Sequence, residues 1–248
     1  TSLFRLHGDP LQQDSWQEQP LSWEVVPNTA MPVDIDNDGD PDVLVAARQT
    51  MEMAVLENTG TLPDGGLAVT AHPIAITAGF PVPPGWTGMS NAFQSAFADL
   101  DGDGRKDLIV SVHEASPEES GNPMIGGLGW LKQPENLDQP WTFYRIGNTL
   151  PDLIAGIAMT DIDGDGDLDA ITGGYSGLNI LAGAYSGASR AEDSPGVTAS
   201  STVGRIAWFE NPGDARKDWK RHDISRRVRG MYDGFIPRDM DGDDDVDL

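Results

Sequence analysis

The chain has 248 residues and carries 40 acidic side chains against 16 basic ones, which gives a formal net charge of -24 at pH 7. This excess of negative charge excludes nucleic acid and anionic membrane surfaces as electrostatic partners. The sequence has no cysteine, which excludes a disulfide framework and thiol chemistry. No apolar run is long enough for insertion into a membrane.

One acidic motif, Asp-x-Asp-x-Asp-x-x-x-Asp, occurs four times along the chain. We number these segments loop 1 (34–42), loop 2 (99–107), loop 3 (161–169) and loop 4 (239–247). Carboxylates at positions 1, 3, 5 and 9 of a tight loop converge, and two of them about 4 Å apart repel by roughly 4 kcal/mol at an effective dielectric near 20. A hard cation with about six to eight oxygen ligands relieves this repulsion. The motif therefore predicts a calcium site in each loop.

The predicted ligands are the carboxylates of positions 1, 3, 5 and 9 and the backbone carbonyl of position 7. Magnesium fits this donor set poorly, because Mg²⁺ prefers a small octahedral shell that retains several waters. We expect about four structural Ca²⁺ ions. Their ligands would be Asp34, Asp36, Asp38, Asp40 and Asp42 in loop 1; Asp99, Asp101, Asp103, Arg105 and Asp107 in loop 2; Asp161, Asp163, Asp165, Asp167 and Asp169 in loop 3; and Asp239, Asp241, Asp243, Asp245 and Asp247 in loop 4.

These loops differ from an EF-hand, which lies between helices and closes with a bidentate Glu at position 12. Position 12 here falls within β-branched runs such as Val43-Leu44-Val45, so each loop is predicted to join two strands. Position 6 is glycine in three loops (Gly39, Gly104 and Gly166), as a sharp turn with positive φ requires. Loop 4 has Asp244 there, and we expect it to be the weaker site.

Two further strand-like runs follow each of the first three loops. A third strand ending in a turn is predicted at 55–60, 130–134 and 208–212. A fourth strand that opens with tryptophan is predicted at 141–146 and 219–224. Each unit is thus predicted to be a four-stranded antiparallel meander of about 65 residues with its acidic loop between strands one and two. The recurring Trp130, Trp141, Trp208 and Trp219 are expected to pack between units.

Fixed-period units of four short strands are typical of β-propeller blades. The sequence therefore predicts an all-β fold, with 1–248 forming a single β-propeller domain or part of one. Its four repeats begin near residues 31, 93, 156 and 233, and the last blade is expected to be incomplete. The run 23–26 resembles a fourth strand, which suggests closure between the two ends of the chain.

With four in-phase loops of this kind, the chain from about Trp23 to Leu248 resembles the FG-GAP/VCBS repeat family, whose calcium-loop blades also occur in integrin α-subunit propellers. The Phe-Gly and Gly-Ala-Pro signatures of one branch are missing. The resemblance implies a β-propeller in a secreted, extracellular or periplasmic protein. It also implies a role in adhesion or in binding glycans or proteins, or as an accessory domain of an enzyme.

Every long predicted connection falls on the face opposite the acidic loops: 78–92, 113–126, 147–155, 174–203 and 225–232. We expect ligands to bind there. Aromatic side chains suit sugar stacking or protein contact, and arginines suit an anionic group such as a uronate. The candidates are Trp86, Tyr175, Tyr185, Arg227 and Arg229. The alternative is that these segments are only solvated insertions.

No nucleophile elbow, zinc-protease helix motif or phosphate loop is present in the sequence. The sequence therefore favours a calcium-stabilised extracellular binding module for glycan or protein ligands over an enzyme. The alternative is the propeller domain of a carbohydrate-active enzyme, either a polysaccharide lyase or a sugar dehydratase. No catalytic residue can be assigned from the sequence.

Overall fold

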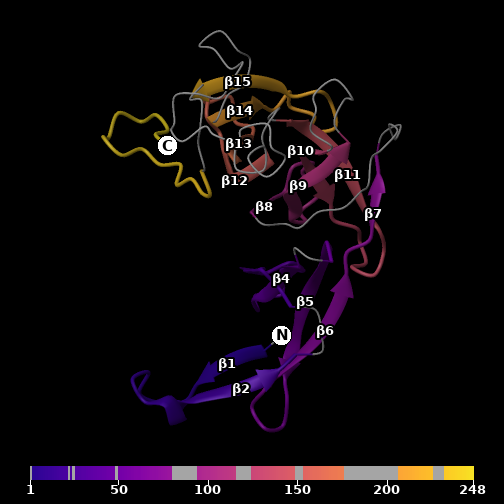
Figure 1. Ribbon diagram of the computed structural model, residues 1–248, viewed down its shortest axis with the longest axis vertical. Helices are drawn as coiled ribbons and strands as arrows, with labels where there is room; N and C mark the ends of the chain where they lie inside the picture. The colour runs from indigo at the N-terminus through magenta and orange to yellow at the C-terminus, as the bar shows by residue number, and fades with distance from the viewer. Residues whose placement is uncertain are drawn as a thin grey trace, which may run out of the picture.

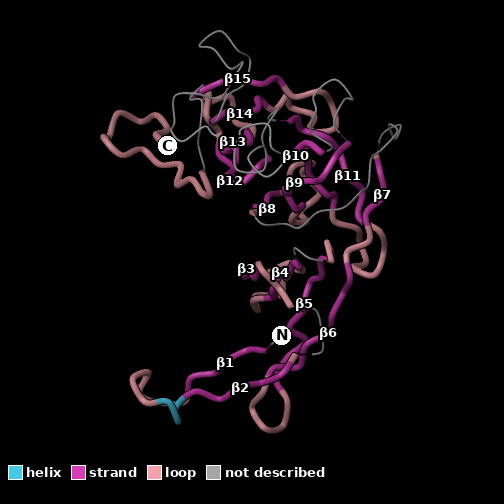
Figure 2. The backbone as a smooth tube through the Cα atoms, viewed as in Figure 1, coloured by secondary structure: helices cyan, strands magenta, loops and turns pink. Residues whose placement is uncertain are grey.

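The computed structural model describes residues 2–21, 23, 26–47, 50–79, 94–115, 124–148, 153–175, 206–225 and 232–248. Within these residues the chain is all-β except for one 3-10 turn, η1 (Gln13–Ser15). The strands form one two-stranded hairpin and three larger sheets (Figure 1). Figure 2 shows that strands and turns make up nearly all of the described chain. The all-β prediction is confirmed.

The N-terminal hairpin consists of β1 (Ser2–Leu6) and β2 (Trp16–Pro20), paired antiparallel with Leu6 opposite Trp16. Gln19 attaches it to the first sheet, because its side-chain amide donates to the carbonyl of Leu67 at 2.7 Å and its amide oxygen accepts from the Leu67 N–H at 3.0 Å. The sequence analysis predicted no strands here. Of the strand expected at 23–26, Trp23 and Val26 lie outside strands, and residues 24 and 25 lie outside the described part of the chain.

The first sheet has the order β3-β4-β5-β6, with β3 (Thr29–Val33), β4 (Asp42–Ala47), β5 (Glu52–Thr61) and β6 (Leu67–Pro73). Neighbouring strands are antiparallel, and loop 1 joins the first two. The turn predicted to end the third strand near residue 60 is wrong. β5 continues to Thr61 through a register shift at Asn58 and Gly60, and the chain turns at 62–66 instead, where Gly65 has φ +81.

The second sheet contains β8 (Ser95–Ala98), β9 (Asp107–Ala115), β10 (Met124–Lys132) and β11 (Trp141–Asn148) as an antiparallel meander, with loop 2 between β8 and β9. A fifth strand, β7 (Ile76–Ala78), pairs in parallel with β11. The Trp141 N–H donates to the Ala75 carbonyl and the Gly79 N–H to the Phe143 carbonyl, both at 2.8 Å. The link from the first sheet thereby covers an edge that would otherwise be open.

The third sheet has the order β12-β13-β14-β15, with β12 (Leu153–Thr160), β13 (Asp169–Tyr175), β14 (Ile206–Glu210) and β15 (Lys220–Ser225). Loop 3 joins β12 to β13. Loop 4 lies beyond this sheet, and Arg238 and Asp247 close it with two reciprocal backbone hydrogen bonds of 3.0 Å. The predicted meander with an acidic loop between its first two strands is therefore present in three sheets.

Two apolar cores hold consecutive sheets together. Leu44 and Val55 of the first sheet share a core with Leu131 and Phe143 of the second. The opposite face of the second sheet, with Ile109, Leu128 and Trp130, packs against Ile154, Ala170, Phe209 and Trp219. In Figure 1 the first sheet lies in the lower half of the view beside the N-terminal hairpin, and the second and third sheets lie in the upper half.

The predicted packing of recurring tryptophans between sheets is confirmed for Trp130, Trp141 and Trp219, which are buried in these two cores. Trp208 is half-buried and stacks on His222 of the neighbouring strand with ring centroids 4.2 Å apart. Trp208 lies opposite Ile171 in the register of β13 and β14, on the face of the third sheet that points away from the second. No helix in the described part of the chain is long and apolar enough to span a bilayer.

Candidate metal centres

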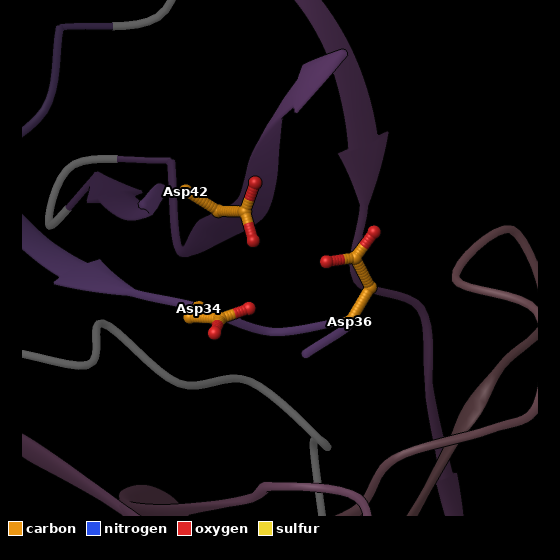
Figure 3. A group of neighbouring side chains, drawn as sticks. All are labelled: Asp34, Asp36 and Asp42. Atoms are coloured by element: carbon orange, nitrogen blue, oxygen red, sulfur yellow. The ribbon is translucent and has the colours of Figure 1, made fainter. Parts of the chain in front are cut away.

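Each acidic loop brings three carboxylates together at positions 1, 3 and 9. One ligand oxygen from each member of a group lies within 4.8 Å of the others. Figure 3 shows the group of loop 1, in which the side chains of Asp34, Asp36 and Asp42 converge from three points along the loop. The other groups are Asp99, Asp101 and Asp107; Asp161, Asp163 and Asp169; and Asp239, Asp241 and Asp247.

In loops 1 to 3, the aspartate of position 9 opens the second strand of the unit and is held by backbone hydrogen bonds. In loop 3, the Oδ2 atom of Asp169 accepts from the Ile162 N–H at 3.1 Å, and its Oδ1 atom accepts from the Asn211 N–H at 2.8 Å. The same two contacts occur at Asp42 and Asp107. This carboxylate therefore ties the loop to the end of the third strand.

The aspartate of position 1 folds the loop around itself. In loop 3, the carboxylate of Asp161 accepts from the N–H groups of Gly164 at 2.8 Å and Gly166 at 3.0 Å. Asp99 and Asp239 make similar contacts in loops 2 and 4. These turns need positive φ at position 6, and Gly39, Gly104 and Gly166 have φ of +94, +85 and +97. Asp244 adopts φ +69 at the same position, as predicted for the exception.

The carboxylates of position 5 lie outside these groups. In loops 1 and 3, Asp38 and Asp165 each accept from the N–H of the position-7 residue, at 2.8 Å and 3.0 Å. Asp103 and Asp243 make the same turn in loops 2 and 4. The structure thus brings together positions 1, 3 and 9 of the predicted donor set. Coordination of the metal by the position-5 carboxylate and by the position-7 carbonyl stays a prediction.

Burial raises the pKa of the position-9 carboxylates in loops 1 to 3. Burial raises the pKa of Asp107 to about 6, with a further contribution from the neighbouring charge of Asp101, although backbone hydrogen bonds from Gln133 and Leu100 oppose the shift. Burial likewise raises the pKa of Asp42 and Asp169. Carboxylates that are buried and crowded in this way favour either a proton or a cation.

Two buried oxygen atoms in these groups have no hydrogen-bond partner: Oδ1 of Asp34 in loop 1 and Oδ1 of Asp101 in loop 2. The side chain of Asp101 is only 2% exposed. A buried carboxylate oxygen without a donor is costly, and a bound metal ion would satisfy it. The donor set consists entirely of oxygen and suits a hard cation such as calcium, so the residues present fit the expected ion.

Loop 2 differs from the others because basic side chains contact its carboxylates. Lys132, at the end of β10, makes ion pairs with Asp101 and with Asp103, the latter at 2.5 Å. Arg216, from the turn between β14 and β15, pairs with Asp101 at 2.5 Å. Neither residue was predicted from the sequence as part of the site. The available signal was Lys132 itself, which stands where the other two units have Glu57 and Glu210.

The predicted ligand-binding residues are largely outside the described part of the chain. This holds for Trp86, Tyr185, Arg227 and Arg229. Tyr175 ends β13, and its side chain also lies outside the described structure. The strand ends shorten the connection predicted at 113–126 to 116–123, between β9 and β10, and shift the one predicted at 174–203 to 176–205, between β13 and β14.

Residues 34–110 match the family model described as an FG-GAP-like repeat. This segment is therefore similar to an FG-GAP-like repeat. It starts at position 1 of loop 1 and ends within β9, so it contains loops 1 and 2 and the strands between them. The match confirms the resemblance drawn from the acidic motif. No curated protein and no solved structure matches the chain.

Proposed function

We propose that this protein is a calcium-stabilised extracellular β-propeller module that binds glycan or protein ligands. The observation that carries the proposal is the convergence of three carboxylates at the same positions in all four loops. The similarity of residues 34–110 to an FG-GAP-like repeat supports a propeller-type module. In this proposal the three sheets are consecutive blades, and loop 4 opens a further one.

Calcium would be held in each loop by the carboxylates of positions 1, 3 and 9, for example Asp161, Asp163 and Asp169 in loop 3. A bound ion neutralises the repulsion between these carboxylates. It thereby stabilises the loop that joins the first strand of a sheet to the second. The aspartate of position 9 also contacts the end of the third strand. Calcium in the loop would therefore stabilise three strands at once.

Removal of calcium tests the proposal. Extracellular sites of this kind bind at about 10⁻⁴ to 10⁻³ M, and a ligand at 100 times its dissociation constant stabilises the folded state by about 2.7 kcal/mol per site. We expect EGTA to lower the melting temperature of the full chain, and added CaCl₂ to restore it. Equal concentrations of MgCl₂ serve as the control and should restore it less. A melting temperature that EGTA leaves unchanged would contradict the proposal.

Ligand binding is proposed for the edge of the sheets opposite the acidic loops. In an antiparallel meander the connection between strands two and three leaves from that edge, and the longest one follows β13. Loops longer than about 12 residues in a compact domain are usually functional. The arginines Arg227 and Arg229 would contact an anionic group of the ligand.

A glycan array with and without calcium would identify the ligand class. Two variants then test the site: deletion of the middle of 176–205, and the pair Arg227→Gln with Arg229→Gln. Each should abolish binding to the array hits while the calcium-dependent melting curve shifts by less than about 0.5 kcal/mol, because the changes lie outside the sheets. Full binding by both variants would place the ligand elsewhere.

A further inference from the structure

Positively charged side chains, two of them from other parts of the chain, contact the carboxylates of loop 2. The ammonium of Lys132 contacts both Asp101 and Asp103, and the guanidinium of Arg216 contacts the same Oδ2 atom of Asp101. Arg105 adds an ion pair with Asp103 at 2.5 Å. Asp101 belongs to the group of three carboxylates that would hold the metal. These cations therefore lie beside the proposed calcium position.

Among the described residues, no lysine or arginine is ion-paired with a carboxylate of loops 1, 3 or 4. In loop 1, Lys106 contacts the backbone carbonyl of Asp34 and, at 3.1 Å, the side-chain oxygen of Asn37, and neither acceptor is a carboxylate. The positions equivalent to Lys132 are acidic and point to other partners. Glu57 contacts His72 at 2.6 Å, and Glu210 contacts Lys220 at 3.0 Å. Position 7 is Asp in the other three loops but Arg105 in loop 2.

We propose that Lys132 and Arg216 are internal counter-cations of loop 2, which make it a weaker calcium site than loops 1 and 3 and link it to the third sheet. The inference rests on the proposed calcium function. Arg216 belongs to a turn of the third sheet, whereas Asp101 belongs to the second. Calcium that enters loop 2 must compete for Asp101 with a residue of the neighbouring sheet.

The neighbouring contacts keep that turn in place without the ion pair. The indole N–H groups of Trp130 and Trp219 both donate to the carbonyl of Ala215 at 3.0 Å. Ala215 is buried in the core between the second and third sheets. Arg216 is thus anchored next to loop 2 through its own backbone, and its side chain is half-exposed. Replacement of this side chain should leave the fold intact.

Two variants test the inference in the full chain by calorimetric calcium titration. Lys132→Gln and Arg216→Gln each remove one positive charge beside loop 2. A monovalent cation about 5 Å from Ca²⁺ weakens binding roughly tenfold even at the dielectric constant of water, and this value is a lower limit beside the buried Asp101. We therefore expect each variant to tighten one of the calcium sites by about tenfold or more and to leave the others unchanged.

The matched control is Lys217→Gln, which removes a charge from the same turn. Its ammonium lies 3.7 Å from Asp214 and contacts no loop carboxylate, so calcium affinity should not change. A double variant that combines Lys132→Gln with Asp99→Asn tests whether loop 2 is the affected site. In Asp99→Asn, which disables loop 2, the gain from Lys132→Gln should disappear. Persistence of that gain would overturn the assignment to loop 2.

A calcium-free measurement supplies an independent readout. In EGTA, Lys132→Gln should lower the melting temperature relative to Lys217→Gln, because the loop 2 carboxylates lose their counter-ion. Calcium affinities that remain at the wild-type value in both variants would overturn the inference, while the calcium function would stand. If the wild-type chain binds no calcium at millimolar concentration, the proposed function itself fails and the inference fails with it.

Discussion

His72 connects two sheets through a pair of carboxylates. It lies in β6 of the first sheet, and its Nε2 atom is 2.6 Å from Glu57 in the adjacent strand β5. Its Nδ1 atom is 2.7 Å from Asp138, which belongs to the turn between β10 and β11 of the second sheet. Burial lowers the pKa of His72, but hydrogen bonds to Asp138 and Glu57 outweigh this effect and raise it above its usual range.

A raised pKa in the folded state means that the protonated imidazole stabilises the fold. The full contribution is present below the unfolded pKa of about 6.5 and is lost as the pH rises through the higher folded value. We expect His72→Gln to lower the free energy of unfolding by roughly 1–2 kcal/mol at pH 5.5 and by much less at pH 9, after allowance for the exposure of Asp138. Chemical denaturation at both pH values measures this. An equal loss at the two pH values would contradict the interpretation.

At the scale of a single loop, positions 3 and 9 have different tasks. Asp169 accepts two backbone hydrogen bonds, from Ile162 and Asn211, and is 1% exposed. Asp163 belongs to the same carboxylate group but accepts only one long contact, from the Asp165 N–H at 3.3 Å. The first residue holds the strands together whether or not calcium is bound. The second has a role only when an ion is present.

Replacement of each aspartate by alanine should distinguish the structural role of Asp169 from the metal-dependent role of Asp163. Asp169→Ala leaves two backbone N–H groups unpaired and should cost about 2–4 kcal/mol in EGTA, and more in calcium because a ligand of the ion is lost as well. Asp163→Ala should be destabilising in calcium and nearly neutral in EGTA. Melting curves of both variants in the two buffers provide the measurement. A large loss for Asp163→Ala in EGTA would show that its carboxylate has a structural role of its own.

At the scale of the whole molecule, negative charge is the dominant feature. The formal charge is -24, and each bound calcium would reduce it by two. Self-repulsion of this size destabilises a compact state and is screened by salt. The apolar cores between sheets must outweigh this repulsion when calcium is removed.

Salt should therefore partly replace calcium. We expect a rise in NaCl from about 0.02 M to about 0.5 M to raise the melting temperature in EGTA by roughly 2–4 °C more than in saturating calcium, which corresponds to about 1 kcal/mol for a chain of this size. Differential scanning calorimetry in the four buffers measures both shifts. Identical shifts with and without calcium would mean that repulsion within the loops contributes little to stability.

The sequence by itself determined the strand class and the acidic loops. Short apolar, β-branched runs predict strands, and the Asp-Gly segments between them predict turns. Both signals depend on residues close together in the sequence, so the order of strands and loops can be predicted from local sequence. Gly39, Gly104 and Gly166 adopt the positive φ that the motif requires, and even Asp244 follows the pattern. Positions 1, 3 and 9 converge for the same local reason.

Only the tertiary structure decided which side chains from distant parts of the chain meet. The parallel pairing of β7 with β11, the contact of His72 with Asp138 and the approach of Arg216 to Asp101 join segments far apart in the sequence. Such contacts depend on how the sheets pack, and no repeated pattern in the sequence predicts them. The repeat motif predicts loop 2 as a complete site like loops 1 and 3, whereas packing of the third sheet against the second brings Arg216 to Asp101 and makes loop 2 different.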